Sequence, residues 1–336
     1  FCCCSMKQML NSFREYLKGQ NLNKDQIEES ISIVSRFRNF LLKSGKELET
    51  ASYNDLYDFS DTLMADTTNT IENYISLYRF GIFQKNSELI IATLEIIDGR
   101  EMIENFYNRL NEEFDQQVRD EIFEGIGIPP LGIRPESKPE ITKKLVERFL
   151  SKFGEETAKT FFEIGLRNKY TQSYAAPSQL FSETNDIDEF LKQRHENLVA
   201  TLQNHFEEET LFFIQEIDEE VISYVRARPT IEGGIREGNR VIITKIPYLA
   251  KQFIHATNDK MKRYYFCHNP WIRDALKEED QPINPVFCGC SAGYFKNFWD
   301  AVLGLPVRVE VLKSVINGDA ICEFALHLPP NLAKEG

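Results

Sequence analysis

Thiol side chains are concentrated near the C-terminal end of this chain. Four of the seven cysteines lie there, at Cys267, Cys288, Cys290 and Cys322, among aromatic and turn-forming residues. Thiolates bind soft metals or attack electrophiles, and aromatic side chains form the apolar walls of small-ligand pockets. The sequence therefore predicts a functional site in this region, although it does not name the molecule that binds there.

Three roles are open to these cysteines. If all four converge, they can hold zinc in a tetrahedral thiolate site. In an enzyme, Cys288 or Cys290 would be the nucleophile and His268 the base. Alternatively the cysteines line a pocket or pack in the core, which is the commonest fate of free cysteine, and His268 is a half-buried histidine that bonds a carbonyl.

A small ligand is expected between segments 264–271 and 288–299. Its predicted contacts combine aromatic walls with polar groups and a glycine that leaves room for the ligand: Cys267, His268, Trp271, Gly293 and Tyr294. The aromatic residues among them are equally compatible with an ordinary hydrophobic core.

The chain begins with Phe1, and the run Cys2-Cys3-Cys4 follows directly. Residues Phe1 to Ser5 are either a natural extension or an expression remnant. Adjacent cysteines are poorly placed to close a tetrahedral site, so they are not part of the predicted site.

Length and charge restrict the class of protein. A chain of 336 residues exceeds the size at which one core usually keeps growing, so two domains are expected. The net charge of −13 disfavours nucleic-acid binding, which requires basic residues against phosphates. Neither a transmembrane stretch nor a leader peptide is seen, which predicts a cytoplasmic protein that does not enter a membrane. A homodimer is compatible with this composition.

The pattern of apolar residues divides the chain into two parts. Residues 6–124 repeat apolar side chains at three- and four-residue steps, which predicts an all-α bundle, with Asn23 a helix N-cap. Segment 125–140 is rich in proline and glycine and is the predicted linker. Residues 141–330 form the second predicted domain.

This second domain is expected to be α+β with an antiparallel sheet. Helices are predicted over 141–150, 155–168, 187–203, 207–228 and 292–303. Strands are predicted over 240–246, 263–268, 307–312 and 322–328, because these segments are β-branched, aromatic or strictly alternating. The turn at Asn317-Gly318-Asp319 joins the last two strands into a hairpin.

The N-terminal helices resemble the SAM-like core-binding domain of phage integrases. The residues that carry this resemblance are Phe13-Arg14-Glu15-Tyr16-Leu17, the helix around Ile33 to Gly45, Asp55-Leu56-Tyr57, and the helix from Ile71 to Phe80 that ends in Leu77-Tyr78-Arg79-Phe80. The resemblance implies a DNA-embracing module, yet no recombinase catalytic signature follows downstream and the bundle is acidic. Reuse for dimerisation or partner contact is the alternative interpretation.

The C-terminal region resembles vinyl-4-reductase-type small-molecule-binding domains and the sensory domains of aromatic-compound-responsive regulators. The matching motifs are Cys288-Gly289-Cys290-Ser291-Ala292-Gly293-Tyr294, the strand from Val307 to Ser314, and Gly318-Asp319-Ala320-Ile321-Cys322-Glu323-Phe324. The closing hairpin is also similar to the end of the aminothiazoline-carboxylate hydrolase family.

In those sensory domains cysteines and one glutamate hold a structural zinc. The resemblance places Cys288 or Cys290 at the first ligand position and Cys322 at the last. Ser314 and Val311 stand at the middle positions, so two ligands are replaced, and Cys267 would have to complete the site.

The resulting prediction is a small-molecule-binding protein with a cysteine-organised site. One alternative is a hydrolase or reductase that acts on a small heterocyclic compound through Cys and His. The other is a DNA-associated regulator.

Overall fold

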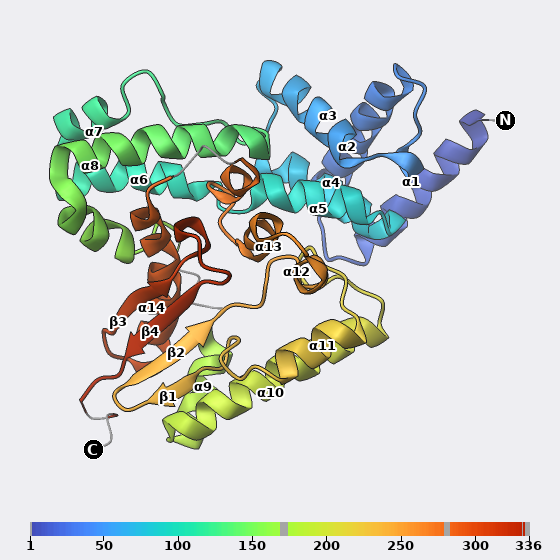
Figure 1. Ribbon diagram of the computed structural model, residues 1–336. Helices are drawn as coiled ribbons and strands as arrows, with labels where there is room; N and C mark the ends of the chain where they lie inside the picture. The colour runs from blue at the N-terminus through green and yellow to red at the C-terminus, as the bar shows by residue number, and fades with distance from the viewer. Residues whose placement is uncertain (1, 169–173, 279–282, 331, 333–336) are drawn as a thin grey trace. The chain divides into compact units, whose positions relative to one another are not determined.

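The structure is a computed structural model that describes residues 2–168, 174–278, 283–330 and 332, with the side chains of residues 2–7 not described. The prediction that residues Phe1 to Ser5 are a natural extension or an expression remnant falls on residues whose side chains lie outside the described part. Helices dominate, and four strands form one antiparallel sheet (Figure 1). The predicted α+β class is therefore confirmed.

The chain divides into two compact units. Unit 1 comprises Phe1–Arg100 and Pro129–Ser137, and unit 2 comprises Glu101–Ile128 and Lys138–Gly336. The division after Arg100 assigns residues 101–124 to unit 2, whereas the sequence pattern grouped them with the first domain. The predicted linker 125–140 is shared between the two units.

Unit 1 has a helical framework with a single apolar core. Its helices are α1 (Cys2–Lys18), α2 (Lys24–Leu42), α3 (Tyr53–Ala65), α4 (Ile71–Gln84) and α5 (Ser87–Ile97), with the 3-10 turns η1 (Leu48–Thr50) and η2 (Pro135–Ser137). The N-cap predicted at Asn23 is confirmed: its side chain accepts from the Gln26 backbone N–H at 2.9 Å, and the Gln26 side chain accepts from the Asn23 N–H at 3.0 Å. This reciprocal pair fixes where α2 begins.

Segment 129–137 belongs to unit 1 because polar contacts hold it against α3 and α4. The Ser60 hydroxyl donates to the Gly132 carbonyl at 2.9 Å and shares a 2.5 Å hydrogen bond with the buried Tyr74 hydroxyl. A Cβ at Gly132 would lie 2.3 Å from the Tyr74 oxygen, and φ there is +108°, so only glycine fits. Arg134 adds ion pairs to Asp58 and Asp61.

Unit 2 combines the sheet with the remaining helices. Its helices are α6 (Glu101–Glu113), α7 (Gln116–Ile122), α8 (Lys138–Glu163), α9 (Ala175–Thr184), α10 (Ile187–Glu207), α11 (Glu219–Arg226), α12 (Ala250–His255), α13 (Asp259–Phe266) and α14 (Gly289–Leu303), with the 3-10 turns η4 (Arg273–Lys277), η5 (Pro285–Cys288) and η6 (Val315–Asn317). Gly154 interrupts α8 with φ of 76° and ψ of 176°, so two helical segments meet there, as the sequence pattern predicts.

The sheet has the order β1-β2-β4-β3 and is antiparallel throughout. Its strands are β1 (Ile235–Glu237), β2 (Arg240–Thr244), β3 (Arg308–Lys313) and β4 (Glu323–His327). The register aligns Val241 with Leu326 and Leu326 with Val309, so these side chains share one face. The predicted β3–β4 hairpin is confirmed.

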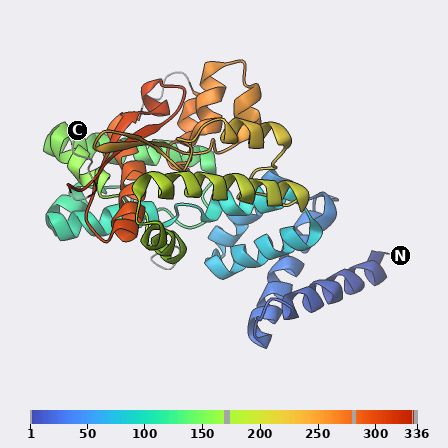
Figure 2. The same ribbon diagram turned by 90° about the horizontal axis from the view of Figure 1, so that it is seen from below.

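Helices α14, α9 and α10 cover this face of the sheet (Figures 1 and 2). Phe295 and Trp299 of α14 and Phe190 of α10 are fully buried in the same core as Val241 and Leu326. The apolar stripe of α14 therefore fixes the helix to the sheet. The polar and thiol groups at its N-terminal end are placed by this packing.

The strand predicted over 263–268 is wrong, because most of this segment is helix α13. Asn258 caps α13, its side chain accepting from the Lys260 and Met261 backbone N–H groups at 2.8 and 3.2 Å. The aromatic run at Tyr264 favours a strand locally, but packing and the cap override that preference.

The single helix predicted over 207–228 is also wrong. Helix α10 ends at Glu207 and α11 starts at Glu219. Between them Glu209 and Phe213 have left-handed φ values of 53° and 56°, which a helix cannot contain. Asp218 begins the next helix by accepting from the Val221 N–H at 2.9 Å.

Candidate functional site

One small cavity of unit 2 collects polar side chains from several separate segments. The cavity has a volume of about 10 Å³, which is room for about one water molecule. The lining residues come from α6, from the segment after α8, from the end of β2, from the turn after α13 and from α14: Met102, Arg167, Lys245, His268, Asn269, Cys290, Ser291 and Tyr294. Among the described residues of this lining there are a guanidinium and an ammonium, and none of them carries a carboxylate.

Arg167 lies in a segment that α6 fixes in place. The Asn105 side chain donates to the Leu166 carbonyl at 2.8 Å, and Arg109 donates to the Gly165 carbonyl at 3.0 Å. Asn105 also donates to the Asn168 side chain at 2.9 Å. Two of these bonds hold the backbone just before Arg167, and the third holds the side chain of the residue that follows it, so α6 fixes the position of this segment.

Close packing of backbones places α14 beside the same segment. A Cβ at Gly293 would lie 2.2 Å from the Gly165 nitrogen and 2.7 Å from the Ile164 carbonyl carbon. Since real Cβ atoms do not approach so closely, Gly293 is the residue that allows the contact. Cys290, Ser291 and Tyr294 reach the cavity because α14 packs at this distance.

Lys245 follows directly after β2, and its ammonium lies near two aromatic side chains of α14. Its Nζ lies 4.5 Å from the ring centroid of Tyr294 and 5.4 Å from that of Phe295. An ammonium at this distance is attracted to the negative face of an aromatic ring. The residue Tyr294 is 39% exposed, while burial of its hydroxyl raises the pKa of Tyr294 to about 12.

His268 and Asn269 are held by backbone groups. The His268 Nε2–H donates a hydrogen bond of 2.6 Å to the Ile246 carbonyl oxygen. The Asn269 Oδ1 accepts from the Trp271 backbone N–H at 3.0 Å, so its NH2 group is the end that remains to donate. Both residues are consequently oriented without help from a ligand.

The structure brings together only part of the predicted ligand-binding set. His268 and Tyr294 line the cavity, as does Cys290. Gly293 does not, because it faces the Gly165 backbone. Cys267 and Trp271 are buried outside the lining; the Trp271 carbonyl accepts from the Thr142 hydroxyl at 2.9 Å, and Lys138 Nζ lies 5.5 Å from its ring centroid.

Three of the cysteines lie in a neighbouring buried region. The Ser314 hydroxyl is 3.0 Å from the Cys288 sulfur, and the Val315 N–H is 3.5 Å from the Cys322 sulfur. The Cys267 sulfur is 4.0 Å from the Asn269 carbonyl oxygen. Burial, followed by the proximity of other thiols, raises the pKa of Cys288 to about 12 and the pKa of Cys322 well above its ordinary value.

These pKa shifts keep the thiols protonated at neutral pH. Burial also raises the pKa of Cys267 and of Cys290. A protonated thiol is a weak nucleophile. In the part of the chain that the structure describes, no group of three or more His, Cys, Asp or Glu side chains is arranged to hold a metal ion. The zinc site at Cys267, Cys288, Cys290 and Cys322 stays a prediction from the sequence.

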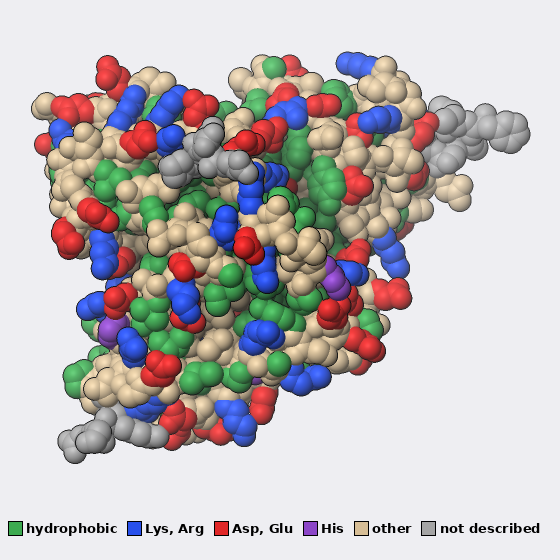
Figure 3. Space-filling view, viewed as in Figure 1, with side chains coloured by type: hydrophobic (Ala, Val, Ile, Leu, Met, Phe, Trp, Pro, Cys, Tyr) green, Lys and Arg blue, Asp and Glu red, His purple; other side chains and the backbone are tan. Residues whose placement is uncertain are grey.

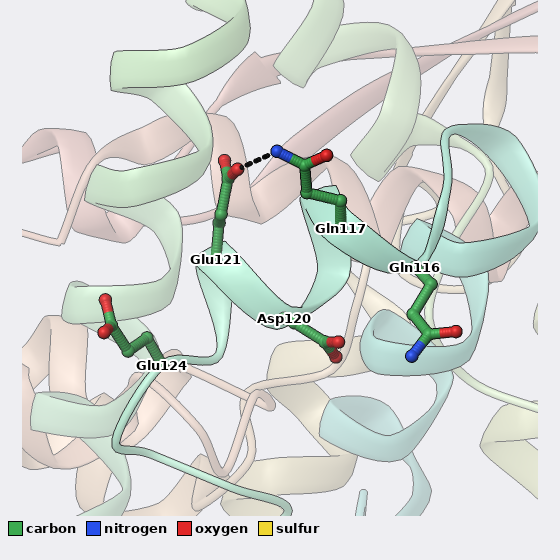
Figure 4. A pocket seen from close by; sticks show the side chains of 5 residues that line it. All are labelled: Gln116, Gln117, Asp120, Glu121 and Glu124. Atoms are coloured by element: carbon green, nitrogen blue, oxygen red, sulfur yellow. Dashed lines mark hydrogen bonds between the residues drawn. The ribbon is translucent and has the colours of Figure 1, made fainter.

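Two further hollows of unit 2 lack this convergence. A shallow one at α7 is lined by Gln116, Gln117, Asp120, Glu121 and Glu124; the Gln117 side chain donates to the Glu121 carboxylate at 2.9 Å, and the other three side chains point away from this pair (Figure 4). Another is an open groove of about 500 Å³ between α8 and the β3–η6 segment, with Glu155, Glu163 and Lys313 on its walls. Neither encloses a set of groups aimed at one point.

Sequence reasoning missed several lining residues. Arg167 was placed inside a predicted helix and Lys245 inside a predicted strand, so neither was singled out. Met102 was assigned to the other domain. No spacing or motif in the sequence marks these three, because they meet only through contacts between distant segments.

On the face shown in Figure 3, Lys and Arg side chains are interspersed with Asp and Glu. None of the described helices is both long enough and apolar enough to cross a membrane.

Comparisons of the chain with protein-family models, with curated proteins and with solved structures gave no match.

Proposed function

We propose that this protein binds a small molecule of which one polar group enters the cavity of unit 2 that is lined by Arg167, Lys245, His268 and Tyr294. The observation that carries the proposal is the convergence of polar side chains from separate segments on one enclosed space. Binding sites for small molecules are concave and combine a few oriented polar groups with apolar walls. Met102 and the Tyr294 ring supply such walls here.

The fixed orientation of the lining groups supports binding. Asn105 and Arg109 anchor the segment that carries Arg167, and the Ile246 carbonyl holds His268. Groups that are held before a ligand arrives lose little entropy when it binds. The resemblance of the C-terminal motifs to vinyl-4-reductase-type domains favours the same class of function.

The chemistry of the thiols favours binding over covalent catalysis. Burial raises the pKa of Cys290, which lines the cavity, so its thiol carries its proton at neutral pH. The Nε2 proton of His268 is held by the Ile246 carbonyl. The pair Cys290 and His268 is therefore better suited to contact a ligand than to attack it.

Filling the cavity tests the proposal. A methionine at position 291 occupies more space than one water molecule, so Ser291→Met should abolish binding while unit 2 stays folded. Ser223→Met, at an exposed position of α11, is the matched control. A panel of small acidic, basic and neutral fragments is screened by saturation-transfer NMR against the three proteins.

The expected result is that at least one fragment binds the wild type and Ser223→Met but not Ser291→Met. The proposal fails if no fragment binds the wild type. It also fails if the same fragments bind Ser291→Met with unchanged affinity, because the ligand site would then lie elsewhere.

A further inference from the structure

We propose that the open groove between α8 and the β3–η6 segment binds an extended, basic peptide segment of a partner protein, which pairs with the edge of the sheet at Val311. This groove of about 500 Å³ is separate from the small-molecule cavity, so the proposal goes beyond the proposed function. Its basis is the direction of the backbone groups of β3, together with the charge of the wall that faces them.

The direction of the β3 backbone groups can be followed through the sheet from β2. The N–H and the carbonyl of Thr244 are both bonded to segment 230–232, at 2.9 and 2.8 Å, so they face away from β4. Successive residues of a strand direct these groups to opposite sides, so Ile243 faces β4 and its partner Phe324 faces β2. Val311 lies opposite Phe324 in β3. The N–H and carbonyl of Val311 therefore point away from the sheet.

The protein closes the rest of this edge with its own groups. β3 is the last strand of the sheet (Figure 1). The backbone N–H groups of Val307 and Ser314, just outside the two ends of β3, are each bonded to an aspartate side chain, at 2.7 and 2.9 Å. Val309 points the same way as Val311 but is buried. Val311 is half-buried and lines the groove, so the edge opens there.

An open strand edge is a template for another extended chain. None of the described residues donates to the Val311 N–H or to its carbonyl. An added strand supplies both partners at once, because two residues of an antiparallel hydrogen-bonded pair exchange two bonds. Main-chain bonds of this kind give the affinity of peptides that extend a sheet.

The facing wall of the groove is acidic. Glu155, Glu156 and Glu163 of α8 line it together with Lys159. Burial raises the pKa of the Glu163 carboxyl, and Lys159 opposes that shift. A further cation beside Glu163 would favour its ionised form. On the β3 wall, Lys313 is ion-paired within the sheet at 2.9 Å. Lysine or arginine side chains of the peptide therefore complement this wall.

Apolar side chains and a bulge restrict the peptide further. Leu312 is 37% exposed and Val286 is half-buried, and both line the groove, so alternate side chains of the peptide have an apolar contact. The register of β3 and β4 shifts between Val311 and Lys313. Because a bulge interrupts regular pairing, the paired stretch of the peptide is short.

An array of synthetic heptapeptides tests the proposal on the full chain. Lys or Arg alternates in these peptides with Val, Ile, Leu, Phe or Tyr, and a matched set carries Glu in place of Lys or Arg. Affinities are measured by fluorescence polarisation at low ionic strength, where charge effects are largest. The tightest basic peptide is then remade with its backbone amides N-methylated one at a time, which removes one donor and keeps every side chain.

We expect the tightest basic peptide to bind at least about tenfold more tightly than its acidic counterpart, because like charges oppose the second peptide. One N-methyl group should weaken binding at least about fivefold through the loss of a hydrogen bond. Methylation of the next amide should have little effect, since that amide faces the other side of the strand. Glu155→Gln and Glu163→Gln should each weaken binding, whereas Glu196→Gln, at an exposed position of α10, is the matched control and should behave as the wild type.

Three results would overturn the proposal: no peptide of the array binds, basic and acidic peptides bind equally, or N-methylation has no effect at any position. Sedimentation of the chain alone adds a fourth. A dimer that Glu163→Gln weakens would assign the groove to a second copy of this chain and refute the peptide. The fragment screen on the cavity is independent of all four results.

Discussion

Gly293 packs against the Gly165 backbone beside the cavity, and Gly293→Ala tests whether this contact positions the site. An added Cβ would lie 2.2 Å from the Gly165 nitrogen, 2.3 Å from the Gly165 Cα and 2.7 Å from the Ile164 carbonyl carbon. All three obstacles are backbone atoms. No side-chain rotation can relieve them, so α14 or the segment that carries Arg167 must move.

The magnitude follows from two opposing terms. Relieving a 2.2 Å contact to an ordinary 3.4 Å requires a displacement of about 1.2 Å. Overpacking of this kind costs about 1–3 kcal/mol, and the upper end applies because the neighbours are backbone. Alanine is a better helix former than glycine by about 1 kcal/mol. The net loss of unfolding free energy should therefore be about 2 kcal/mol.

The assay is urea unfolding followed by tryptophan fluorescence. The two tryptophans of the chain, Trp271 and Trp299, are both buried in unit 2, so the signal reports the unit that contains the cavity. The matched control is Gly289→Ala, one helical turn earlier on the same face. Its added Cβ would lie 3.1 Å from backbone atoms of Phe162 and Glu163, so a shift of a few tenths of an ångström suffices.

Gly289→Ala should therefore stay within about 1 kcal/mol of the wild type. Gly293→Ala should also weaken fragment binding, because Arg167 lies two residues beyond Gly165. A loss below about 0.5 kcal/mol for Gly293→Ala, or equal losses for the two variants, would refute the reasoning. In that case the two backbones are not in the contact described.

Three further predictions concern ionisation, folding and partners. Burial raises the pKa of Cys288 to about 12, whereas the thiol of an unfolded chain titrates near about 8.5. The protonated Cys288 therefore contributes fully to the free energy of unfolding below about pH 8.5. As the pH rises from there towards 12, the free energy of unfolding falls by about 1.4 kcal/mol per pH unit. Urea unfolding at pH 8 and pH 10 should show a shallower loss in Cys288→Ala than in the wild type; equal losses would contradict the shift. Asn23→Ala removes the capping box of α2 and should lower the free energy of unfolding of unit 1 by about 1 kcal/mol. Thermal unfolding is followed by circular dichroism, with Lys24→Ala as the control. An unchanged midpoint of the unfolding transition in Asn23→Ala would show that the cap is unimportant. The full chain should give no salt-sensitive mobility shift of duplex DNA at moderate salt, since acidic residues outnumber basic ones, and such a shift would revive the regulator alternative.

The sequence alone determined the elements whose signals are local. The three- and four-residue spacing in α2 and the Asn23 cap need only neighbouring residues, and so do the strict alternation of β3 and the turn at Gly318. These patterns were sufficient to predict the α+β class and the β3–β4 hairpin. Each depends on backbone geometry within one or two turns of chain.

Tertiary structure decided the elements in which local preference and packing disagree. The aromatic run at Tyr264 has the composition of a strand, yet the Asn258 cap and burial of Phe266 make it helical. Gly293 looked like a residue that leaves room for a ligand, but it leaves room for the Gly165 backbone. A glycine in a sequence shows that space is needed without showing what fills it.

The cavity itself could not be derived from the sequence. His268, Cys290 and Tyr294 were found because aromatic residues, thiols and a histidine attract attention as residue types. Arg167 and Lys245 were not, because the charge of a side chain says nothing of where the fold places it. Their positions depend on hydrogen bonds from α6 and on the packing of α14 against the sheet, contacts between segments far apart in the chain. Local periodicity fixes which residues form a helix or strand, whereas only the packing of those elements determines which side chains meet.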